Sequence, residues 1–184
     1  MRAFIAMDID NPEILAAIQK FQEQIEQTGG DVKMVEGQNM HFTLLFLGEV
    51  SEEEASLVKE RLFIIKQQAF EGELTGTGVY PNPSRINVVW VGVDGDVATS
   101  LKTIADSVIK SLSGSRFRPD KSFEPHLTVA RIKSGRAREK ILEVVNSNSS
   151  VLFGRQQFKE FKLKKSDLTP AGPIYTDLYS FRLG

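Results

Sequence analysis

Apolar and polar residues follow each other along this chain at two different spacings. Short apolar runs of strand length predict β-strands at residues 4–9, 41–47, 70–80, 87–93, 126–132, 151–163 and 175–183. Apolar residues three and four positions apart predict helices at residues 11–27, 51–68, 94–113 and 136–146. An Asn-Pro pair starts the first helix and a Ser-x-x-Glu capping box starts the second. Strands and helices mix along the whole chain, which predicts an α+β protein.

The order of strand, helix, strand, helix and strand occurs twice. Three pairs of segments match at nearly one offset: residues 4–7 with 88–91 at 84, 41–44 with 126–129 at 85, and 70–72 with 153–155 at 83. This internal repeat predicts one bilobal domain over residues 1–184, with halves of roughly 1–86 and 87–184. We expect pseudo-twofold symmetry, two mainly antiparallel sheets with helices outside, and strands exchanged between the lobes. The strands at residues 41 and 126 would then face each other across a central cleft.

Composition excludes several kinds of site. The 184 residues include no cysteine, which excludes disulfides, thiolate nucleophiles and cysteine-based zinc or iron–sulfur sites. A net charge of −1 leaves any contact with nucleic acid to local clusters of charge. No apolar stretch approaches the ~20 residues of a membrane helix, and the N-terminus becomes acidic too early, at Asp8, for a signal peptide. We therefore expect a cytoplasmic monomer that does not bind membranes.

The only two histidines of the chain, His41 and His126, each begin a His-x-Thr segment of a predicted strand. Because side chains alternate along a strand, His41 and Thr43 share one face, and His126 and Thr128 share another. A single strand histidine is more often structural than catalytic. Equivalent positions in a repeat change that expectation, since they should bring both histidines to one site on the symmetry axis.

Two imidazoles and two hydroxyls together suit phosphodiester chemistry. One neutral and one protonated histidine supply a general base and a general acid near neutral pH. Threonine hydroxyls donate hydrogen bonds to phosphate oxygens without ionising. Neither motif strand contains Asp or Glu, and two histidines alone are too few ligands for zinc, so we expect no metal and no other cofactor. A strained cyclic phosphodiester fits this set: one histidine takes the proton of the attacking water, and the other protonates the leaving oxygen.

Five stretches carry a family pattern over nearly the whole chain. They are HFTLLFLG at residues 41–48, GVYPNP at 78–83, VVWVG at 88–92, PHLTVAR at 125–131 and SDLTPAGPIY at 166–175. In this order they resemble the 2H phosphoesterase superfamily, and within it the RNA 2′,3′-cyclic phosphodiesterases, long called 2′-5′ RNA ligases. The resemblance implies a bilobal fold and metal-independent opening of a 2′,3′-cyclic phosphate at an RNA end to a 2′-phosphate.

The resemblance also implies roles for the motif residues. His41 would protonate the leaving O3′ as general acid, and His126 would activate water as general base. Thr43 and Thr128 would hold the non-bridging phosphate oxygens. The sequence by itself is equally compatible with the two histidine roles exchanged.

Phe46 and Arg131 stand five residues after the two histidines, at equivalent positions of the repeat. The resemblance implies that Phe46 stacks on the terminal base and that Arg131 binds phosphate, as an aromatic face and a guanidinium group are suited to do. Strict alternation puts both side chains on the face opposite their histidine. A bulge or strand end near Leu45 and Ala130 must therefore turn them, or they reach the site from its rim. The other interpretation of Phe46 is a core aromatic residue.

Basic residues cluster after the second motif, at Lys133, Arg136, Arg138, Lys140, Lys159, Lys162, Lys164 and Lys165. They predict either a track for the RNA backbone or an ordinary solvated face. Three functions stay open: an enzyme acting on RNA with 2′,3′-cyclic ends such as tRNA halves, a related enzyme acting on a small cyclic nucleotide or ADP-ribose cyclic phosphate, and a non-catalytic RNA-binding module. The complete His-x-Thr pairs favour an enzyme. The same site is also open to the reverse reaction, the joining of tRNA halves through a 2′-5′ bond.

Overall fold

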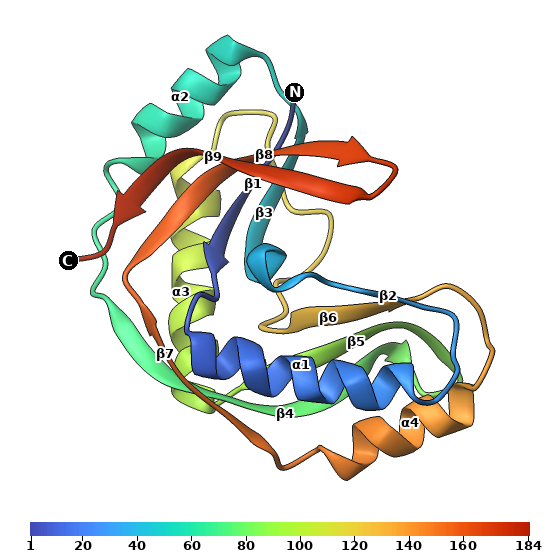
Figure 1. Ribbon diagram of the computed structural model, residues 1–184. Helices are drawn as coiled ribbons and strands as arrows, with labels where there is room; N and C mark the ends of the chain where they lie inside the picture. Colours follow the sequence, from blue (N-terminus) through green and yellow to red (C-terminus); the bar gives the residue numbers. More distant parts are fainter.

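The computed structural model describes residues 1–184 and contains two antiparallel sheets with helices packed against them (Figure 1). The four-stranded sheet has the order β3-β1-β8-β9, with β1 at Arg2–Asp8, β3 at His41–Glu49, β8 at Glu160–Thr169 and β9 at Gly172–Arg182. The five-stranded sheet has the order β2-β6-β5-β4-β7, with β2 at Val32–Met34, β4 at Phe70–Asn82, β5 at Arg85–Val93, β6 at Leu127–Ile132 and β7 at Leu152–Phe158. The helices are α1 (Pro12–Glu26), η1 (Gly37–Asn39), α2 (Glu52–Leu62), α3 (Gly95–Ser111) and α4 (Arg138–Ser147). This arrangement confirms the predicted α+β fold with two antiparallel sheets.

The repeat is visible in the strand pairing. In the four-stranded sheet Ala6 of β1 lies opposite Thr43, and in the five-stranded sheet Trp90 of β5 lies opposite Thr128. Ala6 and Trp90 are the residues that the sequence repeat aligns. The β1–β3 pair and the β5–β6 pair are therefore equivalent halves of one duplicated unit.

The two halves of the chain are interwoven. β4, from the first half, pairs with β5 and β7 in the five-stranded sheet, and β8, from the second half, pairs with β1 in the other sheet. Helix α1 packs on β6 and β7, whereas α3 contacts both β3 and β4 and thus spans the two sheets. Thirty-nine buried apolar residues form a single core cluster, so the two lobes share one interior. No helix is long and apolar enough to span a bilayer.

Local chemistry explains where the helices begin. The Asn11 side chain accepts a hydrogen bond from the Glu13 N–H, and the predicted capping box of Ser51 and Glu54 is formed in both directions. The buried face of α1 consists of Ile14, Ile18, Phe21 and Ile25. These residues have the helical spacing that the apolar pattern predicted.

Several predicted boundaries were wrong. The strand expected at 151–163 is two strands, β7 and β8, which belong to different sheets and meet at Lys159. The helix expected to reach residue 68 ends at Leu62, because the backbones of Gln67 and Ala69 instead pair with Gly184 at the C-terminus. His126 lies just before the first residue of β6. The short elements β2 and η1, of three residues each, were not predicted.

Candidate active site

A β-bulge in β3 determines which side chains share the face of His41. Between Leu45 and Thr43 the pairing with β1 skips Leu44, so that Leu44 and Leu45 are both buried. Side-chain alternation is thereby shifted by one residue. Phe46 returns to the face of His41 and is 60% exposed. It is therefore not a core aromatic residue.

The second motif strand has the same irregularity at the equivalent place. The pairing of β6 with β5 runs from Ala130 to Thr128 and skips Val129, and both Val129 and Ala130 are buried. Arg131 is consequently exposed on the face of Thr128. The sequence left a bulge, a strand end or an approach from the rim open near Leu45 and Ala130, and the structure has a bulge at both places.

His41 is held by hydrogen bonds and by aromatic neighbours. Its Nδ1 lies 2.7 Å from the Asn39 carbonyl oxygen, which can only accept, so Nδ1 carries a hydrogen. Its Nε2 lies 3.1 Å from the Thr43 hydroxyl. The rings of Phe4 and Tyr175 lie 5.0 and 5.3 Å from the imidazole. The group that can gain or lose a proton is therefore Nε2, beside the Thr43 hydroxyl.

Burial lowers the pKa of His41. The Asn39 hydrogen bond and the Asp8 carboxylate act in the opposite direction, while the cations of Lys164 and Arg131 lower the pKa further. The neutral imidazole is consequently favoured in the free protein.

His126 is held in a different way, by one stacking contact. Its ring lies parallel to the Trp90 indole, at an interplanar angle of 1° and a centroid distance of 3.8 Å. Neither ring nitrogen has a hydrogen-bond partner within the protein; only the His126 backbone N–H is bonded, to the Glu124 carbonyl oxygen. Burial lowers the pKa of His126, and the Glu124 charge opposes that shift.

The two motif strands lie next to each other although they belong to different sheets. β3 and β6 are in contact, and Figure 1 shows β6 beside the end of β3 that η1 precedes. The Arg131 charge in β6 is close enough to His41 in β3 to lower its pKa. His41, Thr43, His126 and Thr128 are all partly exposed, so these side chains are accessible to a ligand from solvent.

Three of the lysines predicted for an RNA track form ion pairs instead: Lys162, Lys164 and Lys165, the last of which pairs with Asp167 at 3.4 Å. Lys164, with 7% of its side chain exposed, lies 2.8 Å from Asp8 and 3.1 Å from Asp177. Lys162 contacts the same two carboxylates at 3.0 and 2.8 Å. Although burial opposes the shift, these contacts raise the pKa of Lys162 and lower that of Asp177. The cluster ties β1, β8 and β9 together and leaves little free positive charge for a phosphate.

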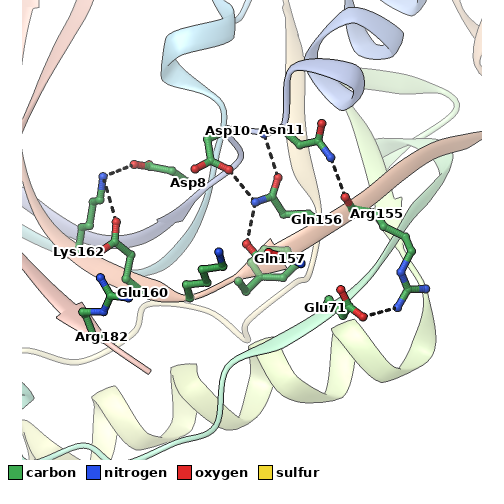
Figure 2. A pocket seen from close by; sticks show the side chains of 12 residues that line it. Asp8, Asp10, Asn11, Glu71, Arg155, Gln156, Gln157, Glu160, Lys162 and Arg182 are labelled. Carbon is green, nitrogen blue, oxygen red and sulfur yellow. Dashed lines mark hydrogen bonds and ion pairs between the residues drawn. The ribbon is translucent and has the colours of Figure 1, made fainter. Parts of the chain in front are cut away.

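A separate polar groove of about 460 Å³ lies where β1 meets α1 (Figure 2). Figure 2 shows its side chains bonded to one another: Gln156 donates to Asp10 and accepts from the Asn11 N–H, and Arg155 pairs with Glu71 at 3.4 Å. Neither histidine lines this groove. No group of three or more His, Asp or Glu side chains is arranged to hold a metal ion anywhere in the protein.

Sequence reasoning missed three neighbours of the histidines. Nothing in the repeat marks Trp90 as a neighbour of His126, although it is the single tryptophan of the chain and stands where the other half has Ala6. Tyr175 lies in a motif stretch, but its contact with His41 brings together strands far apart in the sequence. The Asn39 carbonyl is a backbone group, which no side-chain pattern could indicate.

Comparison with known proteins agrees with this architecture. The model of the LigT-like phosphoesterase family matches the chain twice in succession, at residues 9–90 and 91–175. Relatives named RNA 2′,3′-cyclic phosphodiesterase include one from Archaeoglobus fulgidus, 41% identical over 98% of this chain and 99% of its own length, and one from Methanothermobacter thermautotrophicus, 38% identical over 100% and 99%. Among solved structures, TT0787 of Thermus thermophilus matches with a TM-score of 0.82 and 31% identity, over 100% of this chain and 98% of that one. Escherichia coli LigT in its apo form matches with a TM-score of 0.77 and 25% identity, over 99% and 96%. This chain belongs to the LigT-like phosphoesterase family.

Proposed function

We propose that this protein hydrolyses 2′,3′-cyclic phosphate ends of RNA to 2′-phosphate ends by metal-independent acid–base catalysis with His41 and His126. The observation that carries the proposal is the pair of His-x-Thr motifs, which stand at the starts of two equivalent strands, β3 and β6, that contact each other. The relatives that cover nearly the whole chain are named RNA 2′,3′-cyclic phosphodiesterase, which supports this activity here.

The reaction needs one proton acceptor and one proton donor. His126 takes a proton from water, whose oxygen attacks phosphorus, and His41 gives a proton to O3′ as the P–O3′ bond breaks. The phosphate remains on O2′. The Nδ1 hydrogen of His41 is held by the Asn39 carbonyl oxygen, so Nε2 is the only ring position that can carry the proton to be transferred. This arrangement suits a proton donor.

Binding of an anionic substrate would favour the protonated form of His41. Burial lowers the pKa of His41 in the free protein, but a phosphate monoanion beside Nε2 favours the imidazolium form. Binding of the substrate would therefore help His41 to hold the proton that it needs as general acid.

The remaining polar groups suit the phosphate. Thr43 and Thr128 can each donate a hydrogen bond to a non-bridging oxygen. Arg131, which the bulge in β6 places on the face of Thr128, offers a guanidinium group to the same phosphate. The exposed ring of Phe46, 6.2 Å from Phe4, offers a stacking surface for the terminal base.

The same groups would also join RNA ends. If a 5′-hydroxyl replaces water as the attacking group, opening of the cyclic phosphate leaves a 2′-5′ bond, with the same proton transfers at both histidines. A tRNA half is one RNA with such ends. The cytoplasmic location and the monomeric state of the protein stay predictions.

The test is analysis of the products from an RNA oligonucleotide with a 2′,3′-cyclic phosphate end, in the presence of excess EDTA. We expect ends with a 2′-phosphate, and we expect His41→Ala and His126→Ala each to lower kcat by ~10²–10⁴-fold while the protein stays folded. Cyclic mononucleotides, tested beside the oligonucleotide, measure how much the RNA beyond the terminal residue contributes. Loss of turnover in EDTA, ends with only a 3′-phosphate, or full activity of either histidine variant would contradict the proposal.

A further inference from the structure

Trp90 forms the middle layer of a three-layer stack in the five-stranded sheet. On one side its indole lies parallel to the His126 ring at 3.8 Å. On the other side it covers Gly78, its cross-strand partner in β4, and a Cβ atom at that position would overlap with the indole. The stack can form only because β4 has no side chain at Gly78.

In the other half of the molecule, the residue equivalent to Trp90 has no ring. Ala6 stands there, opposite Thr43, and is fully buried. His41 has hydrogen-bond partners for both ring nitrogens, whereas His126 has none within the protein. The two histidines are thus held by different devices, and stacking on Trp90 is the contact that orients His126.

We propose that Trp90 is a positioning residue for His126: the indole sets the plane of the imidazole and limits its access to water, so that His126 can act as general base. This inference rests on the proposed function, because it assigns a task to a neighbour of the same site. A general base must reach the attacking water within hydrogen-bond distance. An imidazole without ring hydrogen bonds would rotate freely about its side-chain bonds if the indole were absent.

The experiment combines NMR of the histidine ring protons with kinetics. Only two histidines exist, so the spectrum holds two sets of ring signals, and the signals missing in His41→Ala assign them. In Trp90→Leu, we expect the His126 signals to lose the displacement caused by the indole ring current. We also expect the pKa of His126 to rise toward the ordinary value of about 6.5 as water replaces the indole. The His41 signals should keep their wild-type positions.

The kinetic expectation separates positioning from substrate binding. Trp90→Leu should lower kcat about 10- to 100-fold with KM nearly unchanged, because misplacement of a catalytic group costs on that order. The limb of the pH profile of kcat/KM that reports His126 should move to higher pH. Trp90→Phe, which keeps an aromatic face, should restore much of the rate.

Two further variants distinguish loss of the stacking contact from loss of folding. Gly78→Ala leaves Trp90 in the chain but displaces its ring, and should reproduce the NMR and kinetic changes of Trp90→Leu. Phe4→Leu, beside His41, is the matched control: it should move the His41 signals and leave those of His126 in place. Unfolding temperatures are measured for each variant.

Unchanged His126 signals and an unchanged pH profile in Trp90→Leu or in Gly78→Ala would overturn the inference. Its failure is distinct from failure of the proposed function. If the wild-type protein did not open the cyclic phosphate, the proposed function would be wrong, whereas the NMR result on Trp90 and His126 would still decide the positioning role.

Discussion

The two histidines occupy equivalent positions in a duplicated unit, but their surroundings in this protein are chemically different. The Asn39 carbonyl fixes which nitrogen of His41 can exchange a proton, and His126 has both ring nitrogens free of protein partners. Such a division suits a reaction in which one imidazole must donate while the other accepts. The asymmetry arises from a few neighbours, among them Trp90 in one half and Ala6 in the other.

The ionisation of the histidines leads to a prediction about pH. Burial lowers both pKa values below the ordinary 6.5. The base must be neutral and the acid protonated, and in the free enzyme the protonated form is lost as pH rises through a lowered pKa. We therefore expect a bell-shaped profile of kcat/KM that falls between about pH 6.5 and 8, measured with the cyclic-phosphate oligonucleotide. A rate that stays level over this range would contradict the two-histidine assignment.

The acidic side of that profile needs a control for folding. A histidine that is kept neutral by burial stabilises the folded state fully above its unfolded pKa, and this stability is lost as pH falls through the lower folded pKa. Unfolding temperatures measured at each pH will separate loss of the fold from protonation of the base.

At the level of single elements, the bulges in β3 and β6 allow two largely buried strands to present site residues on their exposed face as well. Each bulge buries two successive residues and then returns one side chain, Phe46 or Arg131, to the face of its motif threonine. A regular strand would have hidden both. The irregularity is duplicated together with the motif.

This geometry predicts a specific effect of the Phe46 side chain. Phe46→Ala should cost about 1–3 kcal/mol in kcat/KM for an RNA substrate, because a base loses its stacking surface. Phe63→Ala is the matched control: Phe63 is 59% exposed against 60% for Phe46 but lies at the end of α2. Equal losses in the two variants, measured by steady-state kinetics, would show that Phe46 does not contact the substrate.

The ion cluster across β1, β8 and β9 predicts a large effect on stability. Asp8→Asn leaves Lys162 and Lys164 with Asp177 as their main carboxylate, and because Lys164 is buried, the loss of this partner should cost about 3 kcal/mol. Asp106→Asn in the exposed pair with Lys102 should cost less than about 1 kcal/mol. Free energies of unfolding in urea compare the two, and similar values would contradict the structural role of the cluster.

At the scale of the whole molecule, each half of the chain contributes strands to both sheets, and α3 contacts both of them. Neither sheet can form without chain from the other half. We therefore expect a single cooperative unfolding transition despite the bilobal shape. Trp90 fluorescence should follow the same urea curve as the far-UV circular dichroism, and the slowest amides of β1 and β5 should exchange with the same free energy. Two separate transitions would show that the lobes fold independently.

The amino-acid pattern by itself determined the type of most elements, the internal repeat and both His-x-Thr motifs, because periodicity and duplication are visible within short stretches of sequence. It also indicated that Phe46 and Arg131 could reach the site only through a bulge or strand end near Leu45 and Ala130, or from the rim, since strand alternation puts both on the face opposite their histidine. Only the tertiary structure decided that the strand expected at 151–163 divides between two sheets. Stacking of His126 on Trp90 and the pairing of Lys164 with Asp8 likewise depend on strands brought together by folding. Such contacts join residues far apart in the chain, and their partners are selected by packing and charge in three dimensions rather than by local propensity.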